Sequence, residues 1–143
     1  MSLNTDHLAR CIQTLEKSFL FLGQVEADSI EYEIYRNAVV KGFELTLETT
    51  GKLIRKVLKR YTGAPRTVDE LTYKDALRHA CKHGLMTTDE VSRWFTYRDN
   101  RNTTAHDYGV GFAEKTLTLL PMFIEDAHLL ESTLREKLHH AET

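Results

Sequence analysis

The stretch FELTLETTGKLIRKVL, residues 43–58, decides the fold class. Its apolar residues recur at helical spacing in two adjoining stripes: Phe43, Leu47, Ile54 and Leu58, flanked by Leu53 and Val57. A helix with so wide an apolar surface contacts two neighbours instead of one. The pattern extends from about Ser29 to Tyr61 and predicts a long helix that packs against two neighbours.

The third side of this helix is charged at the same spacing: Lys41, Glu44, Glu48, Lys52, Arg55 and Lys59. Glu48 precedes Lys52 by four residues, the favourable order for an ion pair along a helix. The simplest interpretation is a solvated, salt-bridged face. The densest basic stretch, residues 52–60, either completes the end of the helix or guides RNA.

Helical patterns fill the rest of the chain. One segment, from about Thr5 to Val25, carries a single apolar stripe, and the last segment, after DYGVG, carries another. Pro121 lies inside the last segment and predicts a kink or two successive helices. We therefore expect an all-α, antiparallel up-and-down helical bundle of about five helices with a four-helix core.

Breaks between the helices follow from turn and capping residues. Pro65 disfavours helical geometry in the residue before it, so residues 62–71 are expected to form a loop. Thr72 is predicted to cap a short helix, Tyr73 to His83, which ends at Gly84. Thr88, followed by two acids, is predicted to cap the next helix.

Length and composition indicate one domain covering residues 1–143. The chain is 41% hydrophobic and 28% charged, ordinary values for a domain with its own core. Its net charge of −2 provides no attraction of the whole protein to nucleic acid, so binding would need a local basic patch or a dimer cleft. No membrane span or signal peptide is recognised, and the expected location is the cytoplasm.

Cysteine and histidine usage gives little sign of a metal site. Cys11 and Cys81 lie far apart among apolar neighbours, where reduced, buried thiols are expected. His79 and His83 are four residues apart on one helical face, but Cys81 points elsewhere. No metal and no cofactor are therefore expected.

The stretch FTYRDNRNTTAHDYG, residues 95–109, is the candidate functional segment. Its helix begins with apolar residues and then fills its last turns with arginine, aspartate, asparagine and threonine. On a helical wheel Arg101 falls on the side of Trp94 and His106 on the side of Phe95, so the polar cluster extends an inward or partner-facing surface. Alternatively, the two cations simply close the C-terminus of the helix.

Arg101, Asn102, His106 and Tyr108 reproduce the pattern R-N-x3-H-x-Y. This pattern resembles the signature of the HEPN superfamily, in its nucleotidyltransferase-substrate-binding, HepT-like branch. Residues 43–58 and the segments APRTV and ACKHGLM are similar to the second helix, loop and third helix of the family. Gly51 departs from the pattern, since relatives carry a bulky aromatic residue there.

The resemblance implies a homodimer in which two copies of the motif face each other across a cleft and cut RNA. Arg101 and His106 are then the catalytic residues, with Asn102, Glu44 and Glu48 as binding or supporting residues. Tyr108 is the residue that a minimal nucleotidyltransferase, acting as the antitoxin, modifies with AMP. No membrane association is implied.

The chemistry of these residues agrees with that role. An arginine offers paired donors to phosphate oxygens, and a histidine exchanges protons with a ribose hydroxyl near neutral pH, so no metal is required. Three hypotheses stay open. The first is a metal-independent endoribonuclease toxin, the second a noncatalytic nucleotide- or substrate-binding subunit of a separate nucleotidyltransferase, and the third a plain helical dimerisation module.

Overall fold

The computed structural model describes residues 3–103 and 110–141. Within these ranges the chain is helical and contains no strand. The elements in order are α1 (Asp6–Leu22), α2 (Ile30–Leu58), the 3₁₀ helix η1 (Lys59–Tyr61), α3 (Pro65–Asp69), α4 (Tyr73–Lys82), α5 (Thr88–Thr103) and α6 (Val110–Ala141). The predicted all-α class is confirmed.

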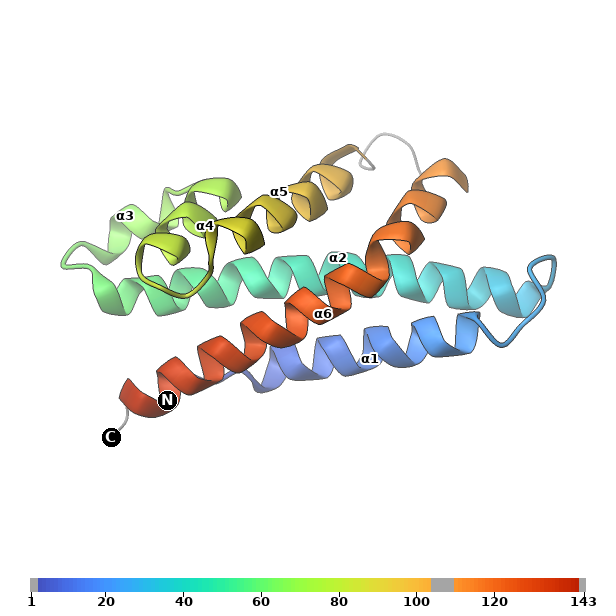
Figure 1. Ribbon diagram of the computed structural model, residues 1–143, viewed down its shortest axis with the longest axis horizontal. Helices are drawn as coiled ribbons and strands as arrows, with labels where there is room; N and C mark the ends of the chain where they lie inside the picture. Colours follow the sequence, from blue (N-terminus) through green and yellow to red (C-terminus); the bar gives the residue numbers. More distant parts are fainter. Residues whose placement is uncertain (1–2, 104–109, 142–143) are drawn as a thin grey trace.

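The long helix α2 runs the length of the molecule, with α1 antiparallel beside it (Figure 1). Helices α5 and α6 continue the alternation of direction, so α1, α2, α5 and α6 form the up-and-down core. The sequence predicted two neighbours for α2, and the helix contacts α1, α4, α5 and α6. The short helices α3 and α4 cover its C-terminal half (Figure 1).

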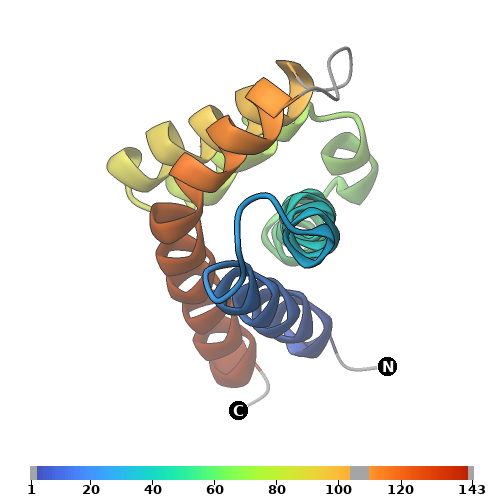
Figure 2. The ribbon, with the colours of Figure 1, turned by 90° about the vertical axis from the view of Figure 1, so that its right-hand side faces the viewer.

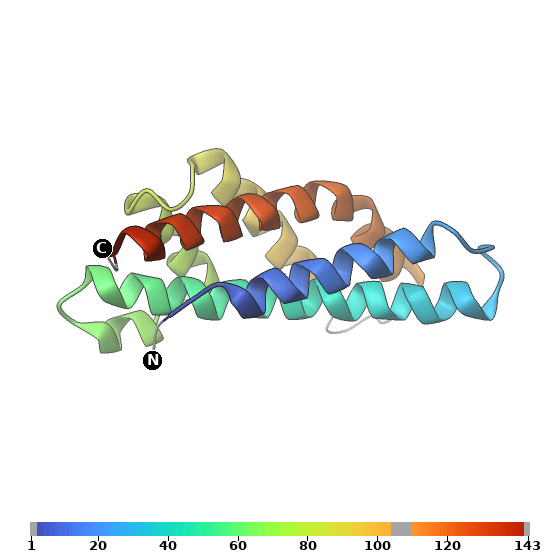
Figure 3. The same ribbon diagram turned by 90° about the horizontal axis from the view of Figure 1, so that it is seen from below.

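Helix α6 contains Pro121 and is nevertheless one continuous helix. Its first part and its last part run in clearly different directions (Figure 2). A bend is the expected result of a missing backbone donor and a ring that crowds the preceding turn. The last part lies beside α1 (Figure 3), where Thr5 donates to Glu131 at 2.8 Å and His128 lies 2.7 Å from Glu16.

Two local predictions were wrong. Residues 62–71 were expected to form a loop, but they contain α3, because Pro65 occupies the first helical turn, where its missing N–H costs no hydrogen bond. Thr88 was expected to cap α5, but Thr87 does so. Its hydroxyl accepts from the amide of Glu90, and its own amide donates to the Glu90 carboxylate, each at 3.1 Å, which is a capping box. The predicted cap at Thr72 is confirmed.

The core between α2, α5 and α6 is aromatic. Trp94, Tyr97 and Phe123 pack edge to face around one point, with ring centroids 5.0–5.4 Å apart, and Phe43 of α2 adjoins Phe123. All four side chains are fully buried. None of the described helices is long and apolar enough to cross a membrane.

Candidate functional site

The first half of α5 is attached to α6 by a buried polar cluster. Asp126 of α6 accepts two hydrogen bonds from the Arg93 guanidinium, at 2.8 and 2.9 Å, and a third from the Tyr97 hydroxyl at 2.5 Å. Burial and the bond to Asp126 raise the pKa of Tyr97, and the bond to Asp126 raises the pKa of Arg93. These groups are therefore a neutral phenol and a permanent ion pair.

This cluster was missed by the sequence analysis, although a signal exists. Asp126 falls between Phe123 and Ala127 on the apolar stripe of α6, where a lone acid needs a buried partner. Arg93 and Tyr97 are one turn apart on α5, so both reach the same carboxylate. The cluster holds α5 in place ahead of the candidate motif.

The second half of α5 contacts three different helices. Asn100 is buried and donates to Thr116 of α6 at 3.0 Å. Asp99 pairs with Lys74 of α4 at 2.7 Å. Arg101 lies 3.9 Å from Glu44 of α2, and both side chains are largely buried, 25% and 16% exposed. Part of the polar segment is therefore structural.

The predicted site residues are placed as follows. Arg101 and Glu44 are brought together across the α2–α5 contact. Glu48 is exposed one turn farther along α2. Asn102 belongs to the last turn of α5, but its side chain is not among those described, and His106 and Tyr108 lie outside the described residues.

The unusual Gly51 has a clear physical reason. A Cβ atom at this position would lie 2.7 Å from Cε2 of Tyr73, so close that the ring or the helix would have to shift. The Tyr73 hydroxyl donates to the backbone oxygen of Leu47 at 3.2 Å, so the ring is fixed against α2. An aromatic ring from α4 thus covers the part of α2 at which a bulky side chain is expected from the family resemblance.

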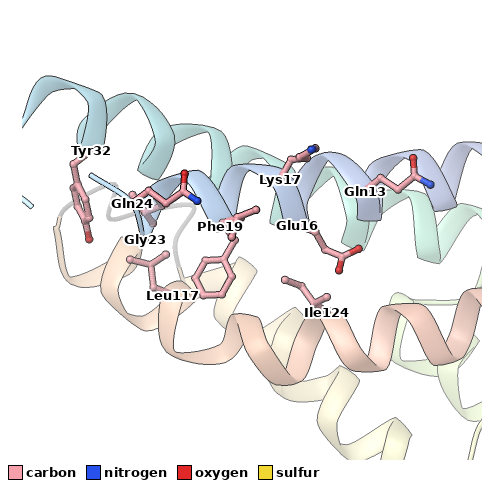
Figure 4. Close-up of a pocket in the computed structure, with 11 residues that line it drawn as sticks. Gln13, Glu16, Lys17, Phe19, Gly23, Gln24, Tyr32, Leu117 and Ile124 are labelled. Atoms are coloured by element: carbon pink, nitrogen blue, oxygen red, sulfur yellow. The ribbon is translucent and has the colours of Figure 1, made fainter. Parts of the chain in front are cut away.

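A large cavity lies elsewhere, between α1 and the first half of α6. Its volume is about 1010 Å³ and its walls are mainly apolar, with Phe19, Tyr32, Leu117 and Ile124 among the lining residues (Figure 4). Arg101, Glu44 and Glu48, the predicted site residues whose side chains are described, do not line it. Among the described residues, no three His, Cys, Asp or Glu side chains are grouped so that they could hold a metal ion.

Comparison with known proteins identifies the family. Residues 3–136 match the family described as "Nucleotidyltransferase substrate binding protein like". The chain belongs to this nucleotidyltransferase substrate-binding family. A relative is the "Probable ribonuclease HepT" of Haemophilus influenzae, which is 24% identical over 139 residues, 94% of each chain.

The nucleotidyltransferase substrate-binding fold is also found among solved structures. HI0074 of Haemophilus influenzae, described as the fold of a substrate binding domain of a nucleotidyltransferase, superimposes with a TM-score of 0.78. The match covers 92% of this chain and 99% of that one at 23% identity, which is a likeness of fold. The predicted membership of the HEPN superfamily, in its nucleotidyltransferase-substrate-binding branch, is confirmed by the family match.

Proposed function

We propose that this protein is the HEPN-type partner of a minimal nucleotidyltransferase in a toxin–antitoxin pair, and that it acts as a metal-independent endoribonuclease. The observation that carries the proposal is the family match over residues 3–136, within which the motif arginine, Arg101, is paired with Glu44. The relative named as a probable ribonuclease supports the same activity.

In the proposed reaction, His106 removes the proton from a ribose 2′-hydroxyl, which then attacks the neighbouring phosphorus. Arg101 stabilises the negative charge that develops on the phosphate oxygens, since a guanidinium fork matches them in shape and charge. A histidine returns a proton to the leaving oxygen. Glu44 orients the Arg101 guanidinium, and Asn102 supports the same site.

The proposed assembly is a homodimer with RNA between two copies of the motif. Control comes from the partner enzyme, which transfers AMP to Tyr108 two residues after His106. A bulky anion at this position would occupy the phosphate site and block cleavage. The description of the family as substrate binding favours a second candidate, a noncatalytic subunit that presents a nucleotide or Tyr108 to the nucleotidyltransferase.

The decisive experiment measures cleavage of labelled single-stranded RNAs by the purified protein, with and without EDTA. We expect EDTA to have no effect and Arg101→Ala or His106→Ala to abolish cleavage. Glu44→Gln should reduce the rate about tenfold through loss of arginine orientation, whereas Glu33→Gln, an exposed control on the same helix, should not.

Other outcomes separate the remaining hypotheses. A wild-type protein that cleaves none of a varied set of RNAs, yet forms a stable complex with the nucleotidyltransferase encoded nearby, would favour the noncatalytic subunit. Mass spectrometry after co-expression with that enzyme tests for one AMP on Tyr108. If double substitution of Arg101 and His106 changes neither growth nor partner binding, the chain is a plain dimerisation module. Light scattering measures the molar mass in solution and so tests whether the protein is a homodimer.

A further inference from the structure

Arg98 lies one turn before Arg101 on α5. It differs in its ion pairing from the neighbouring cations of α4 and α5. Lys74 pairs with Asp99, Arg78 with Asp75, each at 2.7 Å, and Arg101 with Glu44. In the described part of the chain Arg98 has no such carboxylate. Its guanidinium carbon instead lies 4.9 Å from the centroid of the Tyr73 ring.

The Tyr73 ring is a rigid support for this guanidinium. Its hydroxyl is bonded to the Leu47 oxygen at 3.2 Å, and its edge lies where a Cβ of residue 51 would be, so the ring cannot move toward α2. A guanidinium stacked on a ring keeps its N–H donors in its own plane. Arg98 is therefore held in a fixed position, and no acid in residues 3–103 or 110–141 forms an ion pair with it.

The position of Arg98 suits a ligand that extends beyond Arg101. Residues three apart on a helix are neighbours, with Cβ atoms roughly 5–6 Å apart. Arg55 is close enough to Tyr73 to act on the ring electrostatically, and it donates one hydrogen bond to the Leu71 oxygen at 3.1 Å. Arg98, next to Arg101 on α5, therefore has guanidinium donors that no carboxylate within the described residues takes up.

We propose that Arg98 binds the phosphodiester backbone of single-stranded RNA at the phosphate next to the one on which Arg101 acts. Arg98 is then a positioning residue, because it holds the strand in register and does not touch the reacting atoms. This inference rests on the proposed function, since it names a further contact of the same substrate.

The test uses a fluorescent 2′-O-methyl oligoribonucleotide, which keeps its phosphates but lacks the attacking hydroxyl. Binding is measured by fluorescence anisotropy over a range of salt concentrations. Arg98→Gln should weaken binding about tenfold at low salt. It should also reduce the slope of log Kd against log salt by about 0.7 for each Arg98 in contact, the value for one phosphate of a single strand.

Arg78→Gln is the matched control. Arg78 is also a guanidinium stacked on a ring, 5.0 Å from the centroid of Phe95, but it is paired with Asp75. Its substitution should leave the affinity within about twofold and the salt slope unchanged. Arg98→Lys keeps the charge but loses the planar fork, so it should restore the slope and only part of the affinity.

The outcomes separate this inference from the proposed function. If the wild-type protein cleaves RNA and Arg101→Ala does not, but Arg98→Gln has the wild-type salt slope, only the role of Arg98 is overturned. A lower melting temperature without a change of slope would likewise assign Arg98 a structural role alone. A wild-type protein that neither binds nor cleaves RNA overturns both. If Arg98→Gln does not fold, the folded Arg98→Lys variant is used instead. Weaker RNA binding than the wild type then supports the role of Arg98, and equal binding overturns it.

Discussion

Replacing Asp126 by alanine tests whether the buried cluster between α5 and α6 holds the candidate site in place. The Asp126 carboxylate is 7% exposed and accepts three hydrogen bonds, two from Arg93 and one from Tyr97. Without it, the buried Tyr97 hydroxyl loses its partner, which costs about 1–3 kcal/mol. Arg93 is 35% exposed and can turn toward water, so loss of the ion pair adds only about 1 kcal/mol.

The expected loss for Asp126→Ala is therefore about 3 kcal/mol of unfolding free energy. For a chain of this length each kcal/mol lowers the melting temperature by about 3–4 °C, so a decrease of about 10 °C is expected. Thermal unfolding followed by circular dichroism measures it. Tyr97→Phe, which removes one donor and leaves the ion pair intact, should cost about 1 kcal/mol. Glu125→Ala, an exposed neighbour, is the matched control and should have almost no effect.

A double-mutant cycle adds a stricter requirement. Because Asp126 and Tyr97 share one hydrogen bond, the combined loss must be smaller than the sum of the single losses. Strict additivity, or an Asp126→Ala variant as stable as Glu125→Ala, would refute the reasoning. If the cluster also fixes α5 for function, Asp126→Ala should lower RNA affinity at temperatures where it is still folded.

Two further predictions concern Tyr73 and Tyr97. Gly51→Ala should destabilise the protein by about 1 kcal/mol, because the clash with the Tyr73 ring outweighs the gain in helix propensity. In a Tyr73→Ala background, where the ring is absent, the same change should be stabilising. Urea unfolding of the wild type, the two single variants and the double variant measures both effects. Burial raises the pKa of both phenols above their ordinary value of 10.0. Their contribution to stability is complete below that value and is lost as the pH rises above it, since the unfolded chain ionises first. Unfolding free energy should therefore fall as the pH rises above about 10. The fall should be less steep in Tyr97→Phe, and an identical slope would contradict this.

The fold was predictable because the sequence patterns that specify it are local. The two stripes of residues 43–58 showed that α2 packs against more than one helix, and the spacing along each helix identified the four-helix core. Prediction was wrong by one residue at the start of α5, because Thr87 and Thr88 are equally suitable caps and the choice depends on the reach of Glu90. It also missed α3, since one turn of helix leaves no periodic pattern to detect.

In the candidate site, the sequence predicted a contact only where one residue type calls for another, as an arginine calls for an acid. Glu44 was proposed as a support for the motif arginine, and the structure places it 3.9 Å from Arg101. The position of Asp126 on an apolar stripe indicates that it needs a buried partner, but no local pattern identifies Arg93 and Tyr97, which lie far away in sequence, as that partner. Tyr73 was missed for the same reason, because its importance depends on the packing of α4 over Gly51.

The polar end of α5 combines structural contacts with the arginine orientation that the proposed function requires, because consecutive helical residues point about 100° apart. Four successive residues therefore cover the whole circumference of the helix. Arg98 and Asp99 face α4, Asn100 faces α6 and Arg101 faces α2. A helix end held from three sides cannot rotate without breaking a buried contact. Such restraint is what a phosphate-binding arginine needs, since a guanidinium that is already oriented loses little entropy when its ligand arrives.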